Sequence, residues 1–169
     1  MEKFKYNTID EAIAAIKAGQ MVLVTDDEDR ENEGDLIMAA ELCTPEAINF
    51  MAKEARGLIC MPADSEVMDK LQFGAMVTHN TDNHETAFSV SIDHVDTTTG
   101  ISAYERAYTM KKCAEPGAQP SDFRRPGHVS RCAHARVVYW CAPVTPKPLL
   151  ICASCRPAAR RHLLRDYER

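Results

Sequence analysis

Hydrophobic residues recur along the chain with two spacings, one typical of helices and one typical of strands. After Thr8, apolar residues recur three or four positions apart. Thr8 and Glu11 form the sequence pattern of a helix capping box. Short apolar runs and strict alternation indicate strands elsewhere. The pattern predicts helices over residues 8–19, 44–56, 65–71 and 102–113, and strands over 21–24, 58–61 and 88–92. Alternating helices and strands predict an α/β fold, a compact layered domain with a mixed sheet covered by helices.

Composition adds a broad class to this picture. The chain has 169 residues, of which 45% are hydrophobic and 27% charged, as in a soluble globular protein with one core. No apolar stretch approaches the roughly 20 residues that span a membrane. The first seven residues lack the apolar segment of a secretory signal. We therefore expect a cytoplasmic protein without a membrane partner.

The charge distribution divides the chain in two. The net charge is −5, but residues 130–169 contain seven Arg, one Lys and two acidic residues, which gives +6 there and leaves −11 for residues 1–129. The same forty residues hold four of the seven cysteines and four prolines, and they contain no glycine. Such asymmetry is typical of an interaction tail or of a segment with a different origin.

The acidic run over residues 26–35 holds the most informative candidate chemistry. It reads D-D-E-D-R-E-N-E-G-D, seven carboxylates in ten positions, and it directly follows a predicted buried strand. A solvated loop is one interpretation. A divalent cation is the other, because Mg²⁺ or Mn²⁺ offsets the repulsion between carboxylates. A calcium-binding EF-hand is excluded, because its twelfth position is Ala40 rather than a glutamate.

The run resembles the acidic active-site loop of 3,4-dihydroxy-2-butanone-4-phosphate synthases. Further matching motifs follow in the same order: G-L-I-C at 57–60, N-T at 80–81, T-T-G-I-S-A at 98–103 and D-F-R-R-P-G-H-V at 122–129. The similarity covers about three quarters of the chain and stops after Val129. We therefore divide the chain into a truncated synthase domain, 1–129, and an aberrant tail, 130–169.

The resemblance implies an enzyme that converts ribulose 5-phosphate into 3,4-dihydroxy-2-butanone 4-phosphate and formate with Mg²⁺. It implies that Glu31 is a metal ligand, and that Arg30, Glu31 and Asp35 contact the substrate. It also implies that His128 is the essential catalytic histidine and that the protein is a homodimer. Two threonines before Gly100 fit either a substrate contact or a turn. Cys60 is expected to pack as a small hydrophobic residue, with a place in the site as the weaker alternative.

The tail departs from the family pattern. After R-P-G-H-V the family continues F-P-L-R-A-R, then a segment ending G-H-T-E-A-A and a later C-E segment, and this chain contains none of them. The resemblance assigns the missing histidine as the second metal ligand and the missing glutamate as part of the site. Codons shifted by one frame from the 130/131 junction can spell P-L-R-A-R and T-G-H-T-E-A-A, and past about residue 159 the other shift can spell A-G-I-C-C-E. These shifts place one insertion or deletion near residues 129/130 and another between about residues 153 and 159. Residues 130–169 therefore read as out-of-frame family sequence.

This interpretation carries consequences for structure and activity. We expect residues 130–169 not to pack as the family's last strand and helices do, which would disrupt the C-terminal part of the fold. We also expect impaired activity, with a non-catalytic remnant that binds metal weakly as the alternative. A zinc site around Cys152 and Cys155 is a weaker interpretation, because one C-x-x-C lacks its paired motif. A basic nucleic-acid-binding tail is equally weak, so we expect no nucleic-acid partner.

Overall fold

A computed structural model describes residues 6–25, 33–83, 86–132 and 150–155. Its strands are β1 Val22–Thr25, β2 Gly34–Ala39, β3 Ile59–Cys60, β4 Phe88–His94, β5 Phe123–Cys132 and β6 Leu150–Cys155. Its helices are α1 Ile9–Lys17, α2 Pro45–Phe50, α3 Ser65–Lys70 and α4 Ala103–Ala114. Short turns of other helix types cover η1 Ala40–Leu42, η2 Met51–Ala55 and η3 Pro120–Asp122.

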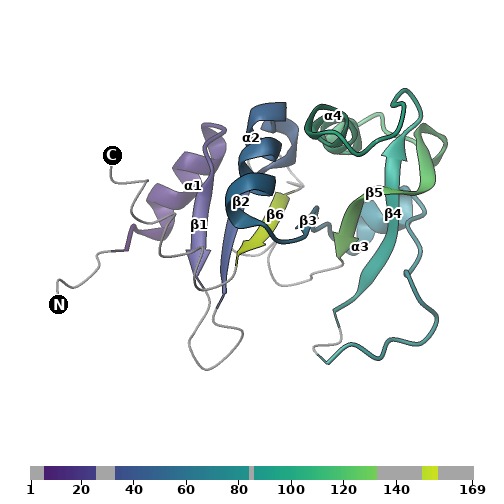
Figure 1. The fold of residues 1–169 in the computed structure, drawn as a ribbon, viewed down its shortest axis with the longest axis horizontal. Coiled ribbons are helices and arrows are strands. Elements are labelled where there is room, and N and C mark those ends of the chain that lie inside the picture. The colour runs from purple at the N-terminus through teal and green to yellow at the C-terminus, as the bar shows by residue number, and fades with distance from the viewer. Residues whose placement is uncertain (1–5, 26–32, 84–85, 133–149, 156–169) are drawn as a thin grey trace.

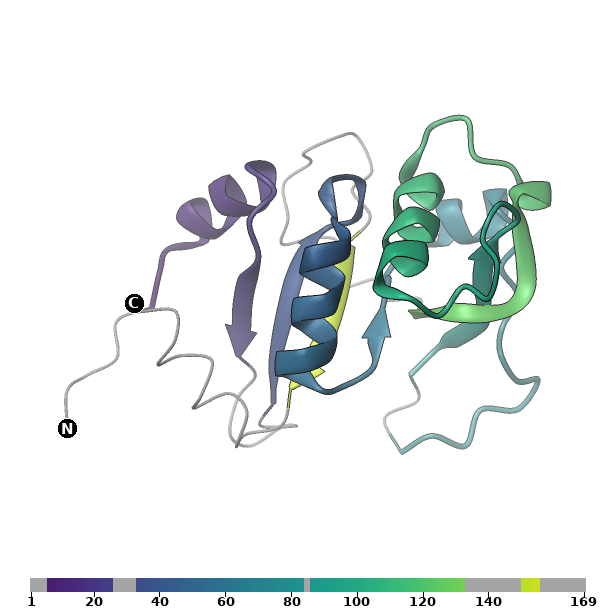
Figure 2. The same ribbon diagram turned by 45° about the horizontal axis from the view of Figure 1, so that its top comes forward.

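The six described strands form one sheet in the order β1-β2-β6-β3-β5-β4 (Figure 1). Most neighbours are antiparallel, but β3 and β5 run parallel, with Cys60 opposite Ser130. The sheet is therefore mixed, and the predicted α/β class with helices over a mixed sheet is confirmed. Figure 2 shows α2 and α4 in front of the sheet and α3 behind it.

Side-chain caps explain where the helices begin. The Thr8 hydroxyl accepts the Glu11 amide at the start of α1, and the Thr44 hydroxyl accepts the Ala47 amide at the start of α2. Asp64 and Ser102 do the same for α3 and α4. Each cap satisfies a backbone N–H that the helix itself leaves open, which is why these starts are readable from sequence.

The core lies between the helices and the sheet. Fully buried side chains from α2, α4 and the strands meet there, among them Ile48, Met110, Ile92 and Val129. Burying an aliphatic side chain of this size contributes about 1.5–3 kcal/mol, so these contacts are what hold α2 and α4 on the sheet. In the described part of the chain, no helix has the length and apolar character needed to cross a membrane.

The structure corrects one expectation. The helix predicted over 44–56 changes to a π-helical turn at Met51, and Arg56, rather than Gly57, takes the left-handed conformation (φ 59°) that ends it. In the tail, Leu150–Cys155 forms β6, which pairs with β2 on one side and β3 on the other. The structure describes only residues 130–132 and 150–155 of the tail, so the expectation that residues 130–169 do not pack as the family's last strand and helices do stays a prediction.

Candidate functional site

A four-residue bulge in β5 builds the site around His128. Ile92 lies opposite Val129, but the next residue of β4, Asp93, lies opposite Arg124, so residues 125–128 project out of the ladder. Gly127 sits on the backbone of β4, where a Cβ would overlap the Ile92 carbonyl carbon. Only glycine allows this approach, which brings the next residue, His128, over Asp93.

Asp93 holds His128 through two hydrogen bonds. The backbone N–H of His128 donates to Asp93 Oδ1 at 2.9 Å, and the imidazole Nδ1 lies 2.8 Å from Asp93 Oδ2. The Asp93 side chain is 8% exposed, whereas that of His128 is 41% exposed. An ionised carboxylate only accepts, so Nδ1 carries the proton, and in the neutral imidazole Nε2 is the nitrogen with an available lone pair. Proton transfer to or from a substrate is the chemistry that this arrangement supports.

The turn after β4 closes over the same carboxylate. Gly100 has φ +83°, and a Cβ at this position would overlap the carboxyl group of Asp93. Thr98 and Thr99 donate their hydroxyl protons to Glu105, at 2.8 and 3.4 Å. Hydrogen bonds from Thr98 lower the pKa of Glu105, which is half-buried. In the structure these hydroxyls therefore hold the turn, and a contact with the substrate stays a prediction.

Asp35 is the second predicted site residue that the structure describes. It lies on β2, opposite Val24 on one side and Ser154 on the other. Its Oδ1 atom is buried and has no hydrogen-bond partner within the part of the chain that the structure describes. A buried oxygen without a donor fits a divalent cation or a substrate hydroxyl. Arg30 and Glu31 lie outside the described residues, and within those residues no three His, Cys, Asp or Glu side chains cluster as a metal site.

The structure does not bring Asp35 and His128 into contact. Their strands, β2 and β5, are separated by β6 and β3. At about 4.8 Å per step across a sheet, the two strands run roughly 14 Å apart. The described residues thus supply two polar centres, one at Asp35 beside the acidic run and one at His128.

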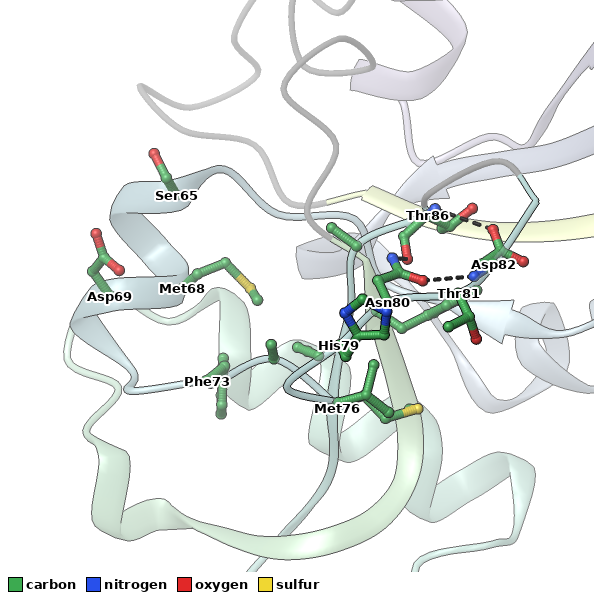
Figure 3. A pocket seen from close by; sticks show the side chains of 15 residues that line it. Ser65, Met68, Asp69, Phe73, Met76, His79, Asn80, Thr81, Asp82 and Thr86 are labelled. Carbon is green, nitrogen blue, oxygen red and sulfur yellow. Dashed lines mark hydrogen bonds between the residues drawn. The ribbon is translucent and has the colours of Figure 1, made fainter.

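A pocket of about 580 Å³ opens next to α3, formed by residues 73–82 and the start of β4 (Figure 3). Asn80, part of the matched N-T motif, uses its amide within the chain: it donates to the Thr86 carbonyl at 3.0 Å and accepts the Asp82 amide at 2.9 Å. Of the predicted site residues that the structure describes, neither Asp35 nor His128 lines this pocket. The Asn80 side chain thus shapes the loop that forms the wall.

The buried thiols are poor nucleophiles. Burial raises the pKa of Cys43 to about 11 and also raises the pKa of Cys113. Cys60 is buried in β3, as expected for a small hydrophobic residue. Because the thiolate is the reactive form, Cys43 and Cys113 are excluded as nucleophiles at neutral pH.

A buried cation follows His128 on the same strand. Arg131 is fully buried, and its guanidinium carbon lies 4.1 Å from the centre of the Phe73 ring. Nη1 contacts the Cys113 sulfur at 3.3 Å, whereas Nε and Nη2 have no hydrogen-bond partner among the described residues. Buried charges in proteins are normally paired, so Arg131 is an anomaly in this core.

Sequence reasoning missed Asp93, the residue that makes His128 a site. The alternation that predicted a strand ends at Ile92, and a carboxylate at the end of a strand is a common and uninformative signal. The pairing that joins Asp93 to His128 spans 35 residues and depends on the bulge. A signal was available in Gly100 and Gly127, whose missing side chains make room around the carboxylate.

Comparisons with known proteins all identify the same family. The family model described as 3,4-dihydroxy-2-butanone 4-phosphate synthase matches residues 10–138. The riboflavin biosynthesis protein RibBA of Bacillus mycoides (strain KBAB4) is 56% identical over 124 residues, and that of Bacillus subtilis (strain 168) is 55% identical over the same length. Each match covers 73% of this chain and 31% of the relative. The chain thus spans about a third of the length of these curated relatives.

Solved structures agree with this similarity. A 3,4-dihydroxy-2-butanone 4-phosphate synthase crystallised in complex with two magnesium ions superposes with a TM-score of 0.84 at 40% identity, over 89% of this chain and 76% of that one. RibBX, a two-domain synthase from A. baumannii, gives a TM-score of 0.86 at 31% identity, over 96% and 54% of the two chains.

Proposed function

Because the chain belongs to the 3,4-dihydroxy-2-butanone 4-phosphate synthase family, we propose that it acts on D-ribulose 5-phosphate. The products are 3,4-dihydroxy-2-butanone 4-phosphate and formate, and the reaction makes the protein a carbon–carbon lyase of riboflavin biosynthesis. The four motifs that follow the acidic run support this proposal. The relatives are named for riboflavin biosynthesis and are much longer than this chain, so its own activity is an inference.

One observation carries the proposal: His128 is held through Nδ1 by the buried Asp93 carboxylate. The reaction begins with removal of a proton next to a carbonyl group, which requires a positioned base. Nε2 of His128 is the candidate, because the bond to Asp93 fixes the tautomer that leaves its lone pair available. The burial of Asp93 keeps water from competing for that bond.

The acidic region fits a divalent cation, Mg²⁺ or Mn²⁺. The orphaned Oδ1 of Asp35 is an oxygen donor of the kind that these cations prefer, and Glu31 adds a carboxylate from the same run. When bound, the cation supplies Lewis-acid stabilisation of the negative charge that develops on substrate oxygens. Arg30 is proposed to bind the substrate, since guanidinium pairs well with phosphate and carboxylate groups. The solved relative with two magnesium ions supports this assignment.

We further propose that the chain as written turns over slowly. It contains no counterpart of the G-H-T-E histidine or of the later glutamate. Misplacing a substrate by about 1 Å can cost on the order of a hundredfold in rate. The second candidate function, a remnant that binds metal weakly, is favoured by one observation: just after the matched motif, Nε and Nη2 of the buried Arg131 have no partner among the described residues.

Two further assignments rest on the resemblance. We propose that the protein forms a homodimer and that ribulose 5-phosphate is its small-molecule partner. Sedimentation of the purified chain tests the first assignment: a mass near twice that of one chain supports it, and a monomer at all concentrations contradicts it.

Formate release tests the function. The chain as written is compared with a chain in which the reading frame is restored at both shifts, near residues 129/130 and between about residues 153 and 159, both with Mg²⁺ and ribulose 5-phosphate. We expect release from the restored chain and at least about a hundredfold less from the chain as written. Absence of release from the restored chain would contradict the function. Equal release from both chains would contradict the impairment.

A further inference from the structure

Glu105 makes more hydrogen bonds than a helix start requires. Its Oε1 accepts the Thr98 amide at 2.5 Å and the Thr98 hydroxyl at 2.8 Å. Its Oε2 accepts the Gly100 amide at 3.0 Å and the Ser102 hydroxyl at 3.3 Å. Both oxygens are therefore used, and both amide donors lie upstream of the helix, in the turn that follows β4.

The first helix provides the contrast. Glu11 stands at the same third position of α1, and it accepts the Thr8 amide at 2.7 Å and the Thr8 hydroxyl at 3.1 Å. That is the ordinary capping box, in which the carboxylate bonds the cap residue itself. In α4 the carboxylate bonds Thr98 and Gly100 instead of the backbone of the cap residue, Ser102. Its contacts thus fix a loop as well as a helix end.

The loop that Glu105 fixes is the wall behind Asp93. Gly100 lies so close to the Asp93 carboxyl that a side chain would overlap it. Asp93 in turn accepts both the amide and the imidazole Nδ1 of His128. If the loop moved away, water would reach the carboxylate and compete for the Nδ1 proton.

We propose that Glu105 is a positioning residue for the proposed reaction: it holds the 98–100 loop against Asp93 and thereby keeps His128 in its Nδ1–H form. This proposal deepens the proposed function and rests on it. The hydrogen bonds found for Glu105 among the described residues go to residues 98–102 and not to His128, so Glu105 acts through Gly100 and Asp93. Its effect therefore shows in the state of His128, which a helix cap alone would not change.

The test compares Glu105→Gln with Glu11→Gln in the 169-residue chain. Each variant removes the charge from the third residue of one helix. The readouts are the ¹⁵N chemical shifts of the His128 ring and the hydrogen-exchange rates of the Gly100 and His128 amides. We expect Glu105→Gln to raise both exchange rates at least about tenfold and to mix the ring tautomers. Glu11→Gln should leave His128 unchanged.

Two other outcomes would show that Glu105 is not a positioning residue. If Glu105→Gln lowers stability as Glu11→Gln does but leaves the ring shifts and the His128 amide unchanged, Glu105 is a helix cap and the proposal is wrong. If Glu105→Gln does not fold, Thr98→Val replaces it, because this change removes one hydroxyl donor and leaves the carboxylate. A Thr98→Val spectrum with unaltered His128 tautomers and exchange overturns the proposal.

These measurements test the positioning role of Glu105 independently of the proposed enzymatic function. Ring shifts and amide exchange require no turnover, so a chain without formate release loses the proposed function while the positioning role is still decided. In the frame-restored chain, a positioning role predicts a fall in kcat with little change in KM for Glu105→Gln, and recovery in Glu105→Asp if the shorter carboxylate still reaches Gly100. A change in KM alone would contradict it.

Discussion

His128 and Arg131 lie three residues apart on β5, yet their surroundings differ completely. His128 is paired twice with Asp93, and its side chain is 41% exposed. Arg131 is fully buried, and two of its three guanidinium nitrogens have no partner among the residues that the structure describes. β5 thus carries a paired histidine at the end of the family motif and, three residues later, a buried arginine whose charge is incompletely paired among the described residues. This transition supports the proposal that the sequence changes frame near residue 130.

The largest effect on activity is expected at His128. In the frame-restored chain, His128→Gln should lower formate release by about a hundredfold or more, because general acid–base catalysis contributes 10²–10⁴. Asp93→Asn should cost less, since the imidazole remains but loses its fixed tautomer. Steady-state formate assays check both variants. Full activity in His128→Gln would remove this residue from the proposed chemistry.

A substitution at Arg131 should have the opposite effect, a gain in stability rather than a loss of activity. Arg131→Met keeps the length of the side chain and its contact with Phe73 while it removes a buried charge, so the free energy of unfolding should rise by about 1–3 kcal/mol. Denaturant unfolding measures this change.

Arg125 is the matched control, because it also lies over Phe73, at 5.0 Å. It donates to the carbonyls of Pro120, Phe123 and Leu71, so Arg125→Met should lower stability. If Arg131→Met destabilises the fold as Arg125→Met does, the contrast drawn on β5 fails.

Asp35 extends the comparison, because its buried Oδ1 also lacks a partner among the described residues but has a proposed ligand, the divalent cation. Asp35→Asn should weaken Mg²⁺ or Mn²⁺ binding about tenfold, since an amide oxygen carries no charge. Calorimetry checks this, with Asp10→Asn as a control that removes an exposed carboxylate from the start of α1. Glu31→Gln should weaken binding in the same direction. Unchanged affinity in both site variants would leave the acidic run as a solvated loop.

The smallest effect concerns pH. Hydrogen bonds lower the pKa of Glu105 below the ordinary value of 4.5. A lowered carboxyl pKa stabilises the folded state above that ordinary value, and this contribution is lost as the pH falls through the folded-state pKa. Glu105→Gln should therefore make the acid decline in stability slightly shallower. Unfolding free energies measured across this acid range check the slope, and an identical slope would contradict the shift.

Local signals predicted the helices better than the strands. Thr8, Thr44 and Ser102 act through short-range caps, and the structure confirms all three starts. The strand β2 was missed because its apolar residues follow the acidic run directly, and β5 because Pro126 and Gly127 read as a turn. These two strands exist through pairing with distant partners, which no local pattern contains.

The site shows the same division. His128 was predicted through a motif, and Asp35 through the acidic run. Their partners depend on strand register: Asp93 reaches His128 only because four residues bulge out of β5. The burial of Arg131 was not predicted either, because its position follows from the pairing of Ser89 with Arg131 across β4 and β5.

The position of β6 has a consequence for how this chain is synthesised. The strand is the last along the described chain, yet it lies between β2 and β3 in the middle of the sheet. Until residues 150–155 leave the ribosome, the nascent chain holds two separate pieces, β1-β2 and β3-β5-β4, each with an open edge. Open edges invite pairing with other chains. Chaperones that cover strand edges should therefore associate with the nascent chain longest in the interval between the synthesis of β5 and that of β6.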